Sequence, residues 1–547
     1  MIFDPILPAW RGRKHRAEGH WRDRTLLDYF DEAVARKPDA VALVARRMEN
    51  GGETVLSWRQ LKRLSDRIAL GLHAHGLGRG DVLAFQLPNW WQFYCLHIAC
   101  LRLGVCSNPL MPIFRERELS FMIDFAEAKA LVVPKVFRGH DHAAMARELR
   151  PSLPKLEQLF VVGGNFEAVL LDPALEREAD TEAVFAASRP DPDDVVQLLY
   201  TSGTTGEPKG VMHSSNTLIA VVMSYVERIG LGEDTAILMG SPLAHQTGFI
   251  YGLMLSSVLG AKTCYLDIWD PEAALQLIQD EAVTFTMGAT PFLSDLANSP
   301  ALDSYDISSL ATFVSAGAPL PRVLVERASA RLGCFVHSGW GMTENGLASG
   351  TRKSDPPERV FGTDGSAVSC LELRVIDEEG TPLPDDEEGR LQVRGAGQFV
   401  GYLKRPERHD TNRDGWFETG DNARIDADGY IRISGRSKDI IIRGGENIPV
   451  AEVEDLLYRH PSVADCAIVA MPDKRLGERC CAFVTLRPGA AMLTFEAMCG
   501  FLLECRLAKP YLPERLELLD AMPRTASGKI QKYRLRERAS GLRPMRE

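Results

Sequence analysis

The 547-residue sequence contains no long uninterrupted hydrophobic run. The stretch from Phe93 to Val105 is broken by Arg102, whereas a membrane-spanning helix needs about 20 apolar residues in succession. Basic residues near the N-terminus, such as Arg11 and Arg13, are not followed by an apolar stretch of signal-peptide length. We therefore expect a soluble protein that stays in the cytoplasm and has no membrane span.

An excess of basic residues is also missing. The chain has 63 Lys and Arg against 74 Asp and Glu, which gives a formal net charge of −11. Proteins that bind nucleic acid usually carry a basic stripe, so this balance argues against a general nucleic-acid binder. Any site that holds phosphate groups must therefore concentrate its positive charge locally.

Cysteine pairs with metal-ligand spacing are absent as well. The 11 cysteines are scattered between Cys95 and Cys505, and none forms a C-x-x-C arrangement with histidine partners, so we expect no zinc site. The adjacent Cys480 and Cys481 are expected to pack as small hydrophobic residues in a strand. Many unpaired thiols are typical of a reducing compartment such as the cytoplasm.

The first half of the chain predicts α/β layers. It shows no internal repeat, and at about 100–200 residues per domain the length predicts three or four structural units. Helical and strand patterns alternate, which is typical of parallel sheets covered by helices. The helices are expected at 61–75 and 90–103, and the strands at 82–87, 131–133 and 159–162.

Beyond Gly362 the pattern changes. Short strands at 372–376 and 390–393 are separated by Gly- and Asp-rich turns, which predicts a smaller β-rich subdomain. After Gly435 a helix, two strands and a second helix are expected at 452–459, 466–470, 481–486 and 494–507. We therefore predict a large α/β N-terminal domain over residues 1–435 and a compact α+β C-terminal domain over residues 436–547.

The clearest chemical signal is a glycine-rich loop behind a buried strand. The apolar strand around Leu198 runs into a loop with four hydroxyls, several glycines and a lysine. Glycines let the backbone approach phosphate oxygens, and hydroxyls and amides donate hydrogen bonds to them. The spacing is not that of a Walker loop, and a surface turn is the alternative. The candidate phosphate-binding residues are Thr201, Ser202, Gly203, Thr204, Thr205 and Lys209.

This loop resembles the phosphate loop of the adenylate-forming superfamily, which includes acyl-CoA synthetases, adenylation domains of peptide synthetases and firefly luciferase. Other motifs of that family follow in its order, over about residues 25–535. The segment 315–319 resembles the loop that lies along the adenine. In this sequence its residues include Ala316, Gly317, Ala318 and Pro319.

The segment 340–344 resembles the aromatic-G-x-T-E motif of the family. The resemblance implies that Thr343 contacts the α-phosphate and that Glu344 helps to hold Mg²⁺, with Gly341 and Met342 beside the nucleotide. The family usually has tyrosine where Trp340 stands. An indole can still stack on adenine, but its polar group is a donor only. Taken alone, a Thr-Glu pair after glycine is more typical of a helix cap.

Two later motifs imply the remaining nucleotide and coenzyme contacts. A T-G-D motif ends at Asp421, which the resemblance assigns to the ribose hydroxyls; carboxylates play this part in dinucleotide sites. Further along, Arg436 is implied to pair with nucleotide oxygens, and Lys438 is implied to be the hinge of a mobile C-terminal domain. Gly444 and Gly445 are implied to line the tunnel for the pantetheine arm of coenzyme A.

A motif near the end of the chain, P-R-T-A-S-G-K, finishes at Lys529. It resembles the motif that carries the catalytic lysine of the family. A lysine on a mobile Gly-containing loop can reach the carboxylate and the α-phosphate together and neutralise charge as the acyl-phosphate bond forms. The same motif resembles the sequence that protein acetyltransferases modify in bacterial acyl-CoA synthetases, so an acetyltransferase acting on Lys529 is a candidate partner.

The acyl pocket is expected around His245, which stands where the family has a gate between its two half-reactions. The alternative is a structural histidine that caps a helix. The other expected pocket residues are small and uncharged, which predicts a hydrophobic monocarboxylic acid. They are Gly248, Ala289, Ala316, Gly317 and Gly341.

Together the motifs imply an AMP-forming carboxylate–CoA ligase that uses ATP, Mg²⁺ and coenzyme A. The segments 242–249 and 443–448 resemble bacterial short- and medium-chain acyl-CoA synthetases and cyclohexanecarboxylate–CoA ligases. This favours a medium-chain fatty acid or an alicyclic acid, with a benzoate-type acid as the alternative. Three other functions stay open: transfer of the acyl group to a carrier protein, oxidation of the adenylate as in luciferases, and nucleotide binding without catalysis.

Overall fold

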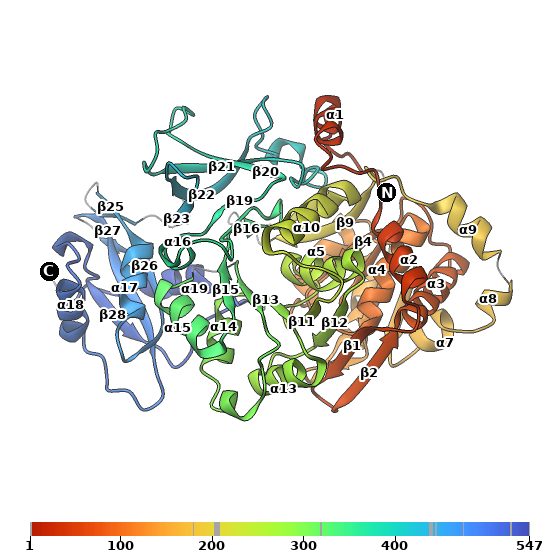
Figure 1. Ribbon diagram of the computed structural model, residues 1–547, viewed down its shortest axis with the longest axis horizontal. Coiled ribbons are helices and arrows are strands. Elements are labelled where there is room, and N and C mark those ends of the chain that lie inside the picture. The colour runs from red at the N-terminus through yellow and green to blue at the C-terminus, as the bar shows by residue number, and fades with distance from the viewer. Residues whose placement is uncertain are drawn as a thin grey trace.

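A computed structural model describes residues 3–178, 180–201, 208–317, 320–436, 441–443, 446–473, 475–525 and 528–545 of the chain. Figure 1 shows a large N-terminal domain and, in blue at one end, a smaller C-terminal domain. This mixed α/β architecture confirms the predicted fold class. The domain boundary near Gly435 stays a prediction.

A six-stranded sheet lies in the N-terminal domain. Its strands follow the order β10-β9-β4-β3-β5-β8, and all neighbours except β10 and β9 run parallel. Strands β3 and β5 are buried along their whole length, as expected of strands that have helices on both faces. The bounds are β10 Lys209–Ser214, β9 Val195–Thr201, β4 Cys106–Pro109, β3 Val82–Phe85, β5 Ala130–Pro134 and β8 Gln158–Val162.

A seven-stranded sheet packs in the same domain, in the order β15-β14-β13-β11-β12-β1-β2. Only β2 runs antiparallel to its neighbour. The carboxyl ends of β11, β13, β14 and β15 therefore lie along one edge, where ligands of parallel sheets commonly bind. The bounds are β15 Phe335–Ser338, β14 Thr312–Ser315, β13 Phe285–Gly288, β11 Ala236–Met239, β12 Lys262–Leu266, β1 Val41–Arg47 and β2 Gly52–Ser57.

Helices with clear start and stop signals cover these sheets. Helix α3 (Trp58–Ala74) begins at a capping box between Ser57 and Gln60. Helices α4 (Trp91–Leu103) and α10 (Ser215–Ile229) each end at a left-handed glycine. The other helices of this domain are α1 Ala9–Ala17, α2 Leu26–Arg36, α5 Glu116–Phe125, α6 His142–Leu149, α7 Phe166–Leu170, α8 Leu175–Glu178, α9 Thr181–Ser188, α11 Gln246–Gly248, α12 Leu255–Leu259, α13 Pro271–Glu281, α14 Thr290–Ala297, α15 Arg322–Leu332 and α16 Pro357–Gly362.

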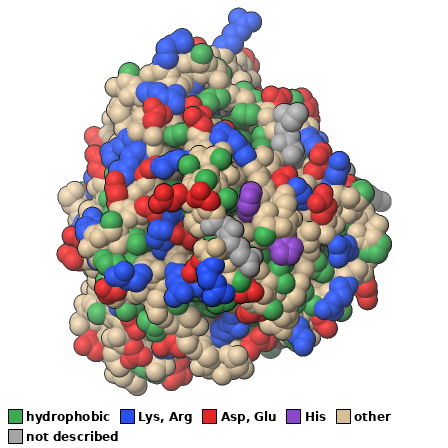
Figure 2. Space-filling view, turned by 90° about the vertical axis from the view of Figure 1, so that its right-hand side faces the viewer, with side chains coloured by type: hydrophobic (Ala, Val, Ile, Leu, Met, Phe, Trp, Pro, Cys, Tyr) green, Lys and Arg blue, Asp and Glu red, His purple; other side chains and the backbone are tan. Residues whose placement is uncertain are grey.

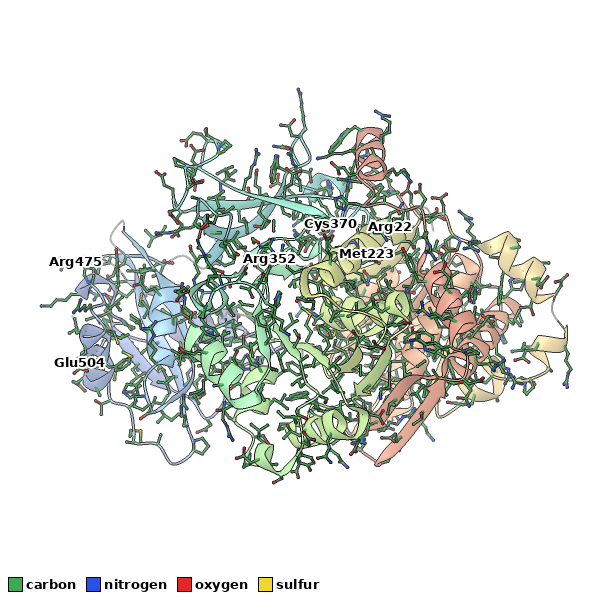
Figure 3. All side chains as sticks on the ribbon, viewed as in Figure 1. Arg22, Met223, Arg352, Cys370, Arg475 and Glu504 are labelled. Atoms are coloured by element: carbon green, nitrogen blue, oxygen red, sulfur yellow. The ribbon has the colours of Figure 1, made fainter. Side chains whose placement is uncertain are left out.

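The β-rich subdomain is an antiparallel sheet that packs against α10. Figure 3 places Cys370 close to Met223 of α10, and Ser369 Oγ donates to Ser224 Oγ of the same helix at 3.1 Å. The sheet consists of β20 Leu371–Ile376, β21 Gly389–Gly395, β22 Phe417–Ile425 and β23 Ile431–Arg436. Short antiparallel pairs join β16 Gly341–Met342 to β17 Gly346–Leu347, β18 Ser349–Gly350 to β19 Ser366–Ala367, and β6 Val136–Phe137 to β7 His140–Asp141.

The C-terminal domain has its own sheet and two apolar clusters. Cys480 packs in one cluster with Leu502, and Cys481 packs in the other with Leu535. Both thiols are buried in β27, which confirms that they pack as small hydrophobic residues. The elements are β24 Ile441–Arg443, β25 Glu446–Ile448, α17 Val450–Tyr458, β26 Val463–Asp473, β27 Gly477–Leu486, α18 Phe495–Glu504, β28 Arg515–Leu518 and α19 Lys532–Ala539.

The predicted elements are found near their expected positions, with small shifts at the ends. The helix expected over 494–507 ends earlier, because α18 stops at Glu504 and Arg506 adopts a φ of 65°. None of the helices in the described ranges is long and apolar enough to cross a membrane. Figure 2 shows acidic and basic side chains interspersed over one face of the molecule, without a patch of one sign.

Candidate functional site

Four of the predicted segments follow the carboxyl ends of neighbouring parallel strands. His245 follows β11, Ala289 follows β13, Ala316 follows β14 and Trp340 follows β15. Because these strands are adjacent and run in the same direction, segments far apart in the sequence meet at one edge of the sheet. The site is therefore assembled by the sheet, and not by one continuous loop.

A small cavity of about 40 Å³ lies at this edge. Side chains from both domains line it, and Lys529 is the one charged residue among the described residues of its wall. The lining residues are His245, Gln246, Thr247, Tyr251, Met287, Ala316, Gly317, Gly341, Met342, Thr343, Gly346, Leu347 and Lys529.

The turn that carries Lys529 is held on both sides. The Thr525 N–H donates to the Lys529 carbonyl at 2.8 Å, and Thr525 Oγ1 accepts from the Lys529 N–H at 3.0 Å. Gly528 has a φ of 86°, which favours glycine, and a Cβ there would lie 3.3 Å from Pro291 of the N-terminal domain. A Cβ on Gly317 would lie 3.7 Å from Lys529 Cε. The C-terminal domain thus brings Lys529 into a cavity of the N-terminal domain.

Ion pairs connect the two domains in this arrangement. Arg432 of β23 donates to Asp455 of α17 at 2.5 Å, and Arg322 of α15 lies 3.9 Å from the same carboxylate. Burial raises the pKa of Asp455, while the two arginines oppose that shift. Within the C-terminal domain, Arg524 bonds Asp465 of β26 and the Gly528 carbonyl, so the turn of Lys529 is tied to the sheet.

His245 both caps a helix and lines the cavity. Its Nδ1 accepts from the Thr247 N–H at 3.3 Å at the start of α11, as the structural alternative predicted. Burial, and secondly the positive charge of Lys529, lower the pKa of His245 to about 3. The imidazole is therefore neutral at physiological pH.

Glu344 is a buried carboxylate with a defined partner. Tyr402 Oη donates to Glu344 Oε1 at 2.7 Å, and Lys209 Nζ lies 4.6 Å from the centre of the Tyr402 ring. Burial, followed by the charge of Glu344, raises the pKa of Tyr402, so the phenol keeps its proton. These contacts place the predicted metal-binding carboxylate close to the predicted phosphate-binding lysine.

The neighbouring Thr343 is held through its backbone. His213 Nε2 donates to the Thr343 carbonyl at 2.8 Å, and His213 Nδ1 lies 3.0 Å from Thr217 Oγ1. Burial lowers the pKa of His213 to about 4, so the ring is neutral, and the nitrogen facing the carbonyl must be the protonated one. This histidine fixes the loop that presents Thr343 and Glu344.

Magnesium fits Glu344 only together with phosphate oxygens. No cluster of three or more His, Cys, Asp or Glu that could hold a metal occurs in the described part of the chain. Mg²⁺ in nucleotide sites is commonly held by one or two carboxylates plus substrate phosphates. The buried Glu344 carboxylate, with 5% of its surface exposed, suits that arrangement.

Trp340 is bonded to the predicted ribose-binding carboxylate. Its Nε1–H donates to Asp421 Oδ2 at 2.9 Å, and both side chains are buried. The Asp421 N–H donates in turn to Thr419 Oγ1 at 3.1 Å. The indole N–H therefore has a partner inside the protein, and it orients Asp421 in β22.

Several predicted residues lie outside the described residues. Thr201 and Lys209 are described and pair directly across β9 and β10, at the two ends of the predicted phosphate loop. The predicted residues that lie outside the described ranges are Ser202, Gly203, Thr204, Thr205, Ala318, Pro319, Lys438, Gly444 and Gly445, together with the side chain of Arg436.

Two predicted pocket residues are not part of the described cavity wall. Gly248 packs against backbone, since a Cβ there would lie 2.2 Å from the Pro242 carbonyl oxygen. The Ala289 methyl faces Gly528, at 3.4 Å from the position of a Cβ on that glycine. Their small size thus serves close packing of the chain, at Gly248 within the N-terminal domain and at Ala289 between the two domains. Ala316, Gly317 and Gly341, by contrast, line the cavity.

The chain matches two family models in the predicted order. The model described as AMP-binding enzyme matches residues 30–403, and the model described as AMP-binding enzyme C-terminal domain matches residues 452–529. The chain belongs to the AMP-binding enzyme family. The predicted membership of the adenylate-forming superfamily is thereby confirmed.

Relatives of this AMP-binding enzyme act on different kinds of acid. The medium-chain fatty-acid–CoA ligase of Escherichia coli (strain K12) is 36% identical over 529 residues, 96% of this chain and 92% of that protein. The 2,3-dihydroxybenzoate-AMP ligase of Bacillus subtilis (strain 168) is 33% identical over 537 residues, 96% of each protein. The solved structure of the anthranilate CoA ligase AuaEII with anthranoyl-AMP shares the fold, with a TM-score of 0.83 at 23% identity, over 95% of this chain and 98% of that chain. The protein is an AMP-forming ligase.

Gln246 is a cavity residue of this AMP-binding enzyme that the motifs did not single out. It is 4% exposed, and its side-chain oxygen and nitrogen have no hydrogen-bond partner among the described residues. An unpaired buried carboxamide is costly, which makes it a place where a ligand would bond. In the sequence, the feature that could have indicated Gln246 is its position directly after His245.

Tyr251 also lines the cavity, and local geometry explains why the sequence pattern did not indicate it. Residues Phe249–Met254 form a π-helical segment between α11 and α12. Such segments often occur at functional sites and change the direction of the side chains. Here Tyr251 Oη accepts from the Leu347 N–H at 3.0 Å, which fixes the tyrosine against β17.

Proposed function

We propose that this enzyme adenylates a compact, ring-shaped monocarboxylic acid with ATP and then transfers the acyl group to coenzyme A. The observation that carries the proposal is the position of Lys529 at a small cavity whose other described lining residues are uncharged. The single positive charge of Lys529 suits a substrate with a single carboxylate. A second carboxylate on the substrate would meet no further positive charge on the described part of this wall.

In the first half-reaction a carboxylate oxygen attacks the α-phosphorus of ATP and pyrophosphate leaves. The Lys529 ammonium lines the same cavity as Thr343, where it would bond both reacting groups and stabilise the developing charge. Because His245 has a pKa of about 3, its neutral ring adds no second positive charge. Mg²⁺ at Glu344 would supply additional positive charge to the phosphate oxygens.

The nucleotide would be bound by residues of the N-terminal domain. Trp340 offers an aromatic face for the adenine, and Asp421 offers carboxylate oxygens for the ribose hydroxyls. The bond from Trp340 Nε1 occupies one side of Asp421 Oδ2 and fixes its direction. Thr201 and Lys209, at the two ends of the phosphate loop, would approach the phosphates together with the loop between them.

Two features of the cavity support a ring-shaped acid. Tyr251 packs edge-on against Tyr225, with ring centres 5.2 Å apart, and both rings are buried, which limits the depth available to a long chain. The unpaired Gln246 carboxamide would bond a polar substituent on the ring. A linear medium-chain acid is the second candidate, and it is supported by the name of the Escherichia coli relative.

The second half-reaction would require the C-terminal domain to rotate about Lys438, so that Lys529 withdraws and Gly444 and Gly445 approach the adenylate. The structure has Lys529 in the cavity, which suits the first half-reaction. Coenzyme A is the proposed acceptor. Transfer to a carrier protein is the alternative, and release of AMP on addition of coenzyme A alone distinguishes the two.

Regulation by acetylation of Lys529 forms part of the proposal. Acetylation removes the positive charge of a lysine, so fully acetylated enzyme should lose adenylation by about 10²–10³-fold while its fold survives. Acetylation at Lys529, confirmed by mass spectrometry, should be compared with deacetylated enzyme in a pyrophosphate-release assay. Normal activity of the acetylated enzyme would contradict both the regulation and the catalytic assignment.

The choice of acid can be tested with a panel of benzoate, 2-hydroxybenzoate, cyclohexanecarboxylate, octanoate and acetate. We expect kcat/KM for AMP formation to be highest for a ring acid and lowest for acetate, because each buried methylene contributes about 0.8 kcal/mol. Gln246→Leu should reduce the preference for 2-hydroxybenzoate over benzoate, whereas Gln276→Leu, on the exposed side of α13, should not. Octanoate as the best substrate would favour the second candidate, and acetate as the best would overturn both.

A further inference from the structure

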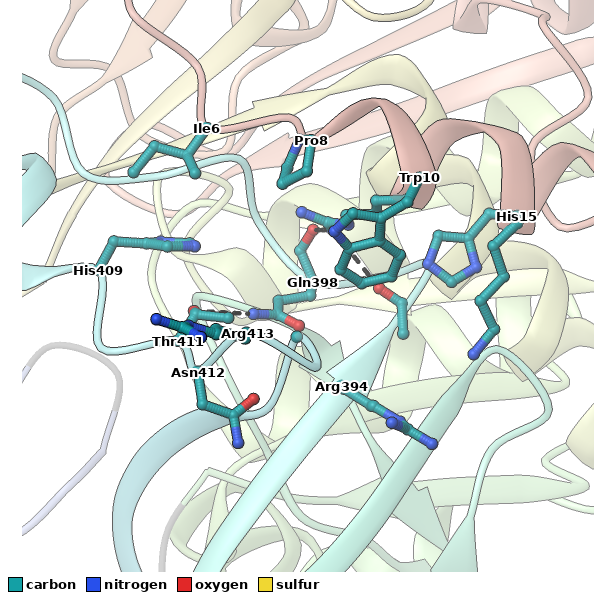
Figure 4. Close-up of a pocket in the computed structure, with 14 residues that line it drawn as sticks. Ile6, Pro8, Trp10, His15, Arg394, Gln398, His409, Thr411, Asn412 and Arg413 are labelled. Atoms are coloured by element: carbon teal, nitrogen blue, oxygen red, sulfur yellow. Dashed lines mark hydrogen bonds between the residues drawn. The ribbon is translucent and has the colours of Figure 1, made fainter.

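Helix α1 covers a second cavity, which is separate from the site of Lys529. The cavity lies between this helix and the β-rich subdomain and has a volume of about 180 Å³. Figure 4 shows Trp10 and His15 on the side of α1, and Arg394, His409 and Arg413 around the same space. None of the residues assigned above to the nucleotide or the acid lines this cavity.

The lining of this cavity is strongly cationic. Arg11, Lys14, Arg394 and Arg413 line it, and no Asp or Glu occurs among its described lining residues. Such a concentration of positive charge is unexpected in a chain whose net charge is −11. Like charges brought together around a cavity repel each other, and a bound anion would remove that cost.

Arg11 is a buried cation that no carboxylate contacts in the described structure, although the charge of Asp193 acts on it from a distance. Its side chain is 6% exposed, Nη1 donates to the Phe399 carbonyl at 2.9 Å, and Nη2 donates to the Gln398 carbonyl. No Asp or Glu lies within ion-pair distance of Arg11 in the described structure, and its Nε has no partner there. Buried arginines are normally paired with an anion.

The other cations leave donors available as well. Glu372 accepts from Lys14 at 3.3 Å and from Arg394 at 2.7 Å, and Lys14 also lies 3.8 Å from Glu18. The Nε–H of Arg394 is buried without a partner among the described residues. Burial lowers the pKa of His409 to about 4, so its unpartnered Nδ1 belongs to a neutral ring. Arg413 is exposed and forms no ion pair or hydrogen bond with any described residue.

We propose that this cavity is a binding site for a small phosphate-like dianion. Guanidinium and ammonium groups that converge from several directions suit the oxygens of a phosphate, and arginine forks bind such oxygens in pairs. A volume of about 180 Å³ admits inorganic phosphate or the head of a phosphate monoester.

The site is connected to the catalytic centre through Phe399. The Phe399 carbonyl accepts from Arg11, while the Phe399 N–H donates to the Glu344 carbonyl at 2.7 Å. The same loop continues to Tyr402, whose hydroxyl bonds the Glu344 carboxylate. A bound anion would hold Arg11, and through it the loop that positions Glu344, so occupancy is placed to influence nucleotide binding.

The test is a titration with inorganic phosphate at constant ionic strength, with chloride as the replacement ion and the midpoint of thermal unfolding as the readout. The double variant Lys14→Gln, Arg413→Gln removes two cations from the cavity without disturbing the buried Arg11. The matched control, Arg13→Gln, Arg22→Gln, removes two exposed cations of the same N-terminal segment that do not line the cavity. Phosphate that binds in the nucleotide loop should raise the unfolding midpoint equally in the wild type, the cavity variant and the control variant.

We expect phosphate to raise the midpoint of the wild type and of the control with the same apparent affinity, and to bind the cavity variant at least tenfold more weakly. Trp10 fluorescence supplies a second readout, because this indole lines the cavity and should respond to phosphate in the wild type but not in the cavity variant. Equal phosphate affinities for all three proteins would overturn the proposal, and so would a loss of affinity that is equal in the control.

Discussion

The two domains contribute to one site in contrasting ways. Residues of the N-terminal domain are fixed by buried hydrogen bonds, such as Trp340 to Asp421, Tyr402 to Glu344 and His213 to the Thr343 carbonyl. Lys529 instead arrives on a turn from the other domain, which contacts the N-terminal domain through the ion pair of Arg432 with Asp455 and through the packing of Gly528 against Pro291. The contrast suits a nucleotide site that is permanent and a lysine that can be withdrawn.

The largest effect on the rate of adenylate formation is expected when the side chain of Lys529 is removed. Lys529→Ala should slow adenylate formation by about 10²–10³-fold, because a charge contact made in the transition state is lost. The same variant should still convert supplied acyl-AMP and coenzyme A to the thioester. The two half-reactions are measured separately, with Lys509→Ala, an exposed lysine away from the cavity, as the control. Equal losses in both half-reactions would show that Lys529 stays in place throughout.

Low pH should destabilise the N-terminal domain more than the C-terminal domain. Burial lowers the pKa of His97 and His337 to about 3 and that of His213 to about 4, and all three lie in the N-terminal domain. Histidine in the unfolded chain has a pKa of about 6.5. As the pH falls from about 6.5 towards 4, the unfolded state therefore binds protons that the folded state does not, and the free energy of unfolding decreases. His213 alone should lower it by up to about 3 kcal/mol.

We therefore expect the N-terminal domain to unfold first in acid, as followed by limited proteolysis between pH 7 and pH 4. His213→Gln keeps a side-chain donor but cannot titrate, so its stability should fall less steeply with pH. The exposed His73→Gln of α3 serves as the control and should behave like the wild type. Earlier cleavage of the C-terminal domain would be contrary to this reasoning.

A smaller effect is expected from the bond between Trp340 and Asp421. Trp340→Phe keeps an aromatic face but removes the N–H, and a hydrogen bond to a charged group is worth about 1.5–3 kcal/mol. The KM for ATP should therefore rise by about tenfold or more, with little change in the KM for the acid. Trp269→Phe is a matched control, because Trp269 Nε1 donates to Asp295 at 3.0 Å away from the nucleotide. A similar rise in both variants would mean that the effect is not local.

The smallest effect is expected from the contact between the domains. Asp455→Asn weakens the pairing with Arg432 and Arg322, and partly exposed ion pairs contribute about 1 kcal/mol or less. Adenylation should slow by a few-fold relative to thioester formation, since the arrangement with Lys529 in the cavity becomes less populated. Asp303→Asn breaks an exposed pair with Arg331 inside the N-terminal domain and should leave the ratio of the two rates unchanged.

Much of the site could be predicted from the sequence because its parts are short motifs at the ends of buried strands. The resemblance to family motifs singled out Ala316 and Trp340, and the structure then shows that both follow neighbouring parallel strands at one edge of a sheet. The partner of the Trp340 indole could not be predicted, because Asp421 lies 81 positions further along the chain, on another sheet.

The acyl side shows why the rest could not be predicted. Gly248 and Ala289 were expected to leave room for the acid, yet their lack of bulk serves backbone and domain packing. Tyr251 lies in the π-helical segment that follows α11, and the helical period of the sequence does not indicate such a change of direction. Gln246 lies at the start of α11, directly after His245, where no motif singled it out. Side-chain direction after an irregular turn depends on contacts that are distant in sequence.

The measurement that tests the account most directly is acid-dependent exchange of pyrophosphate into ATP, carried out without coenzyme A. We predict exchange with cyclohexanecarboxylate or a benzoate-type acid, little exchange with acetate, and loss of exchange in Lys529→Ala. Exchange that does not depend on any acid, or that is unchanged in Lys529→Ala, would contradict the account of a carboxylate activated beside Lys529.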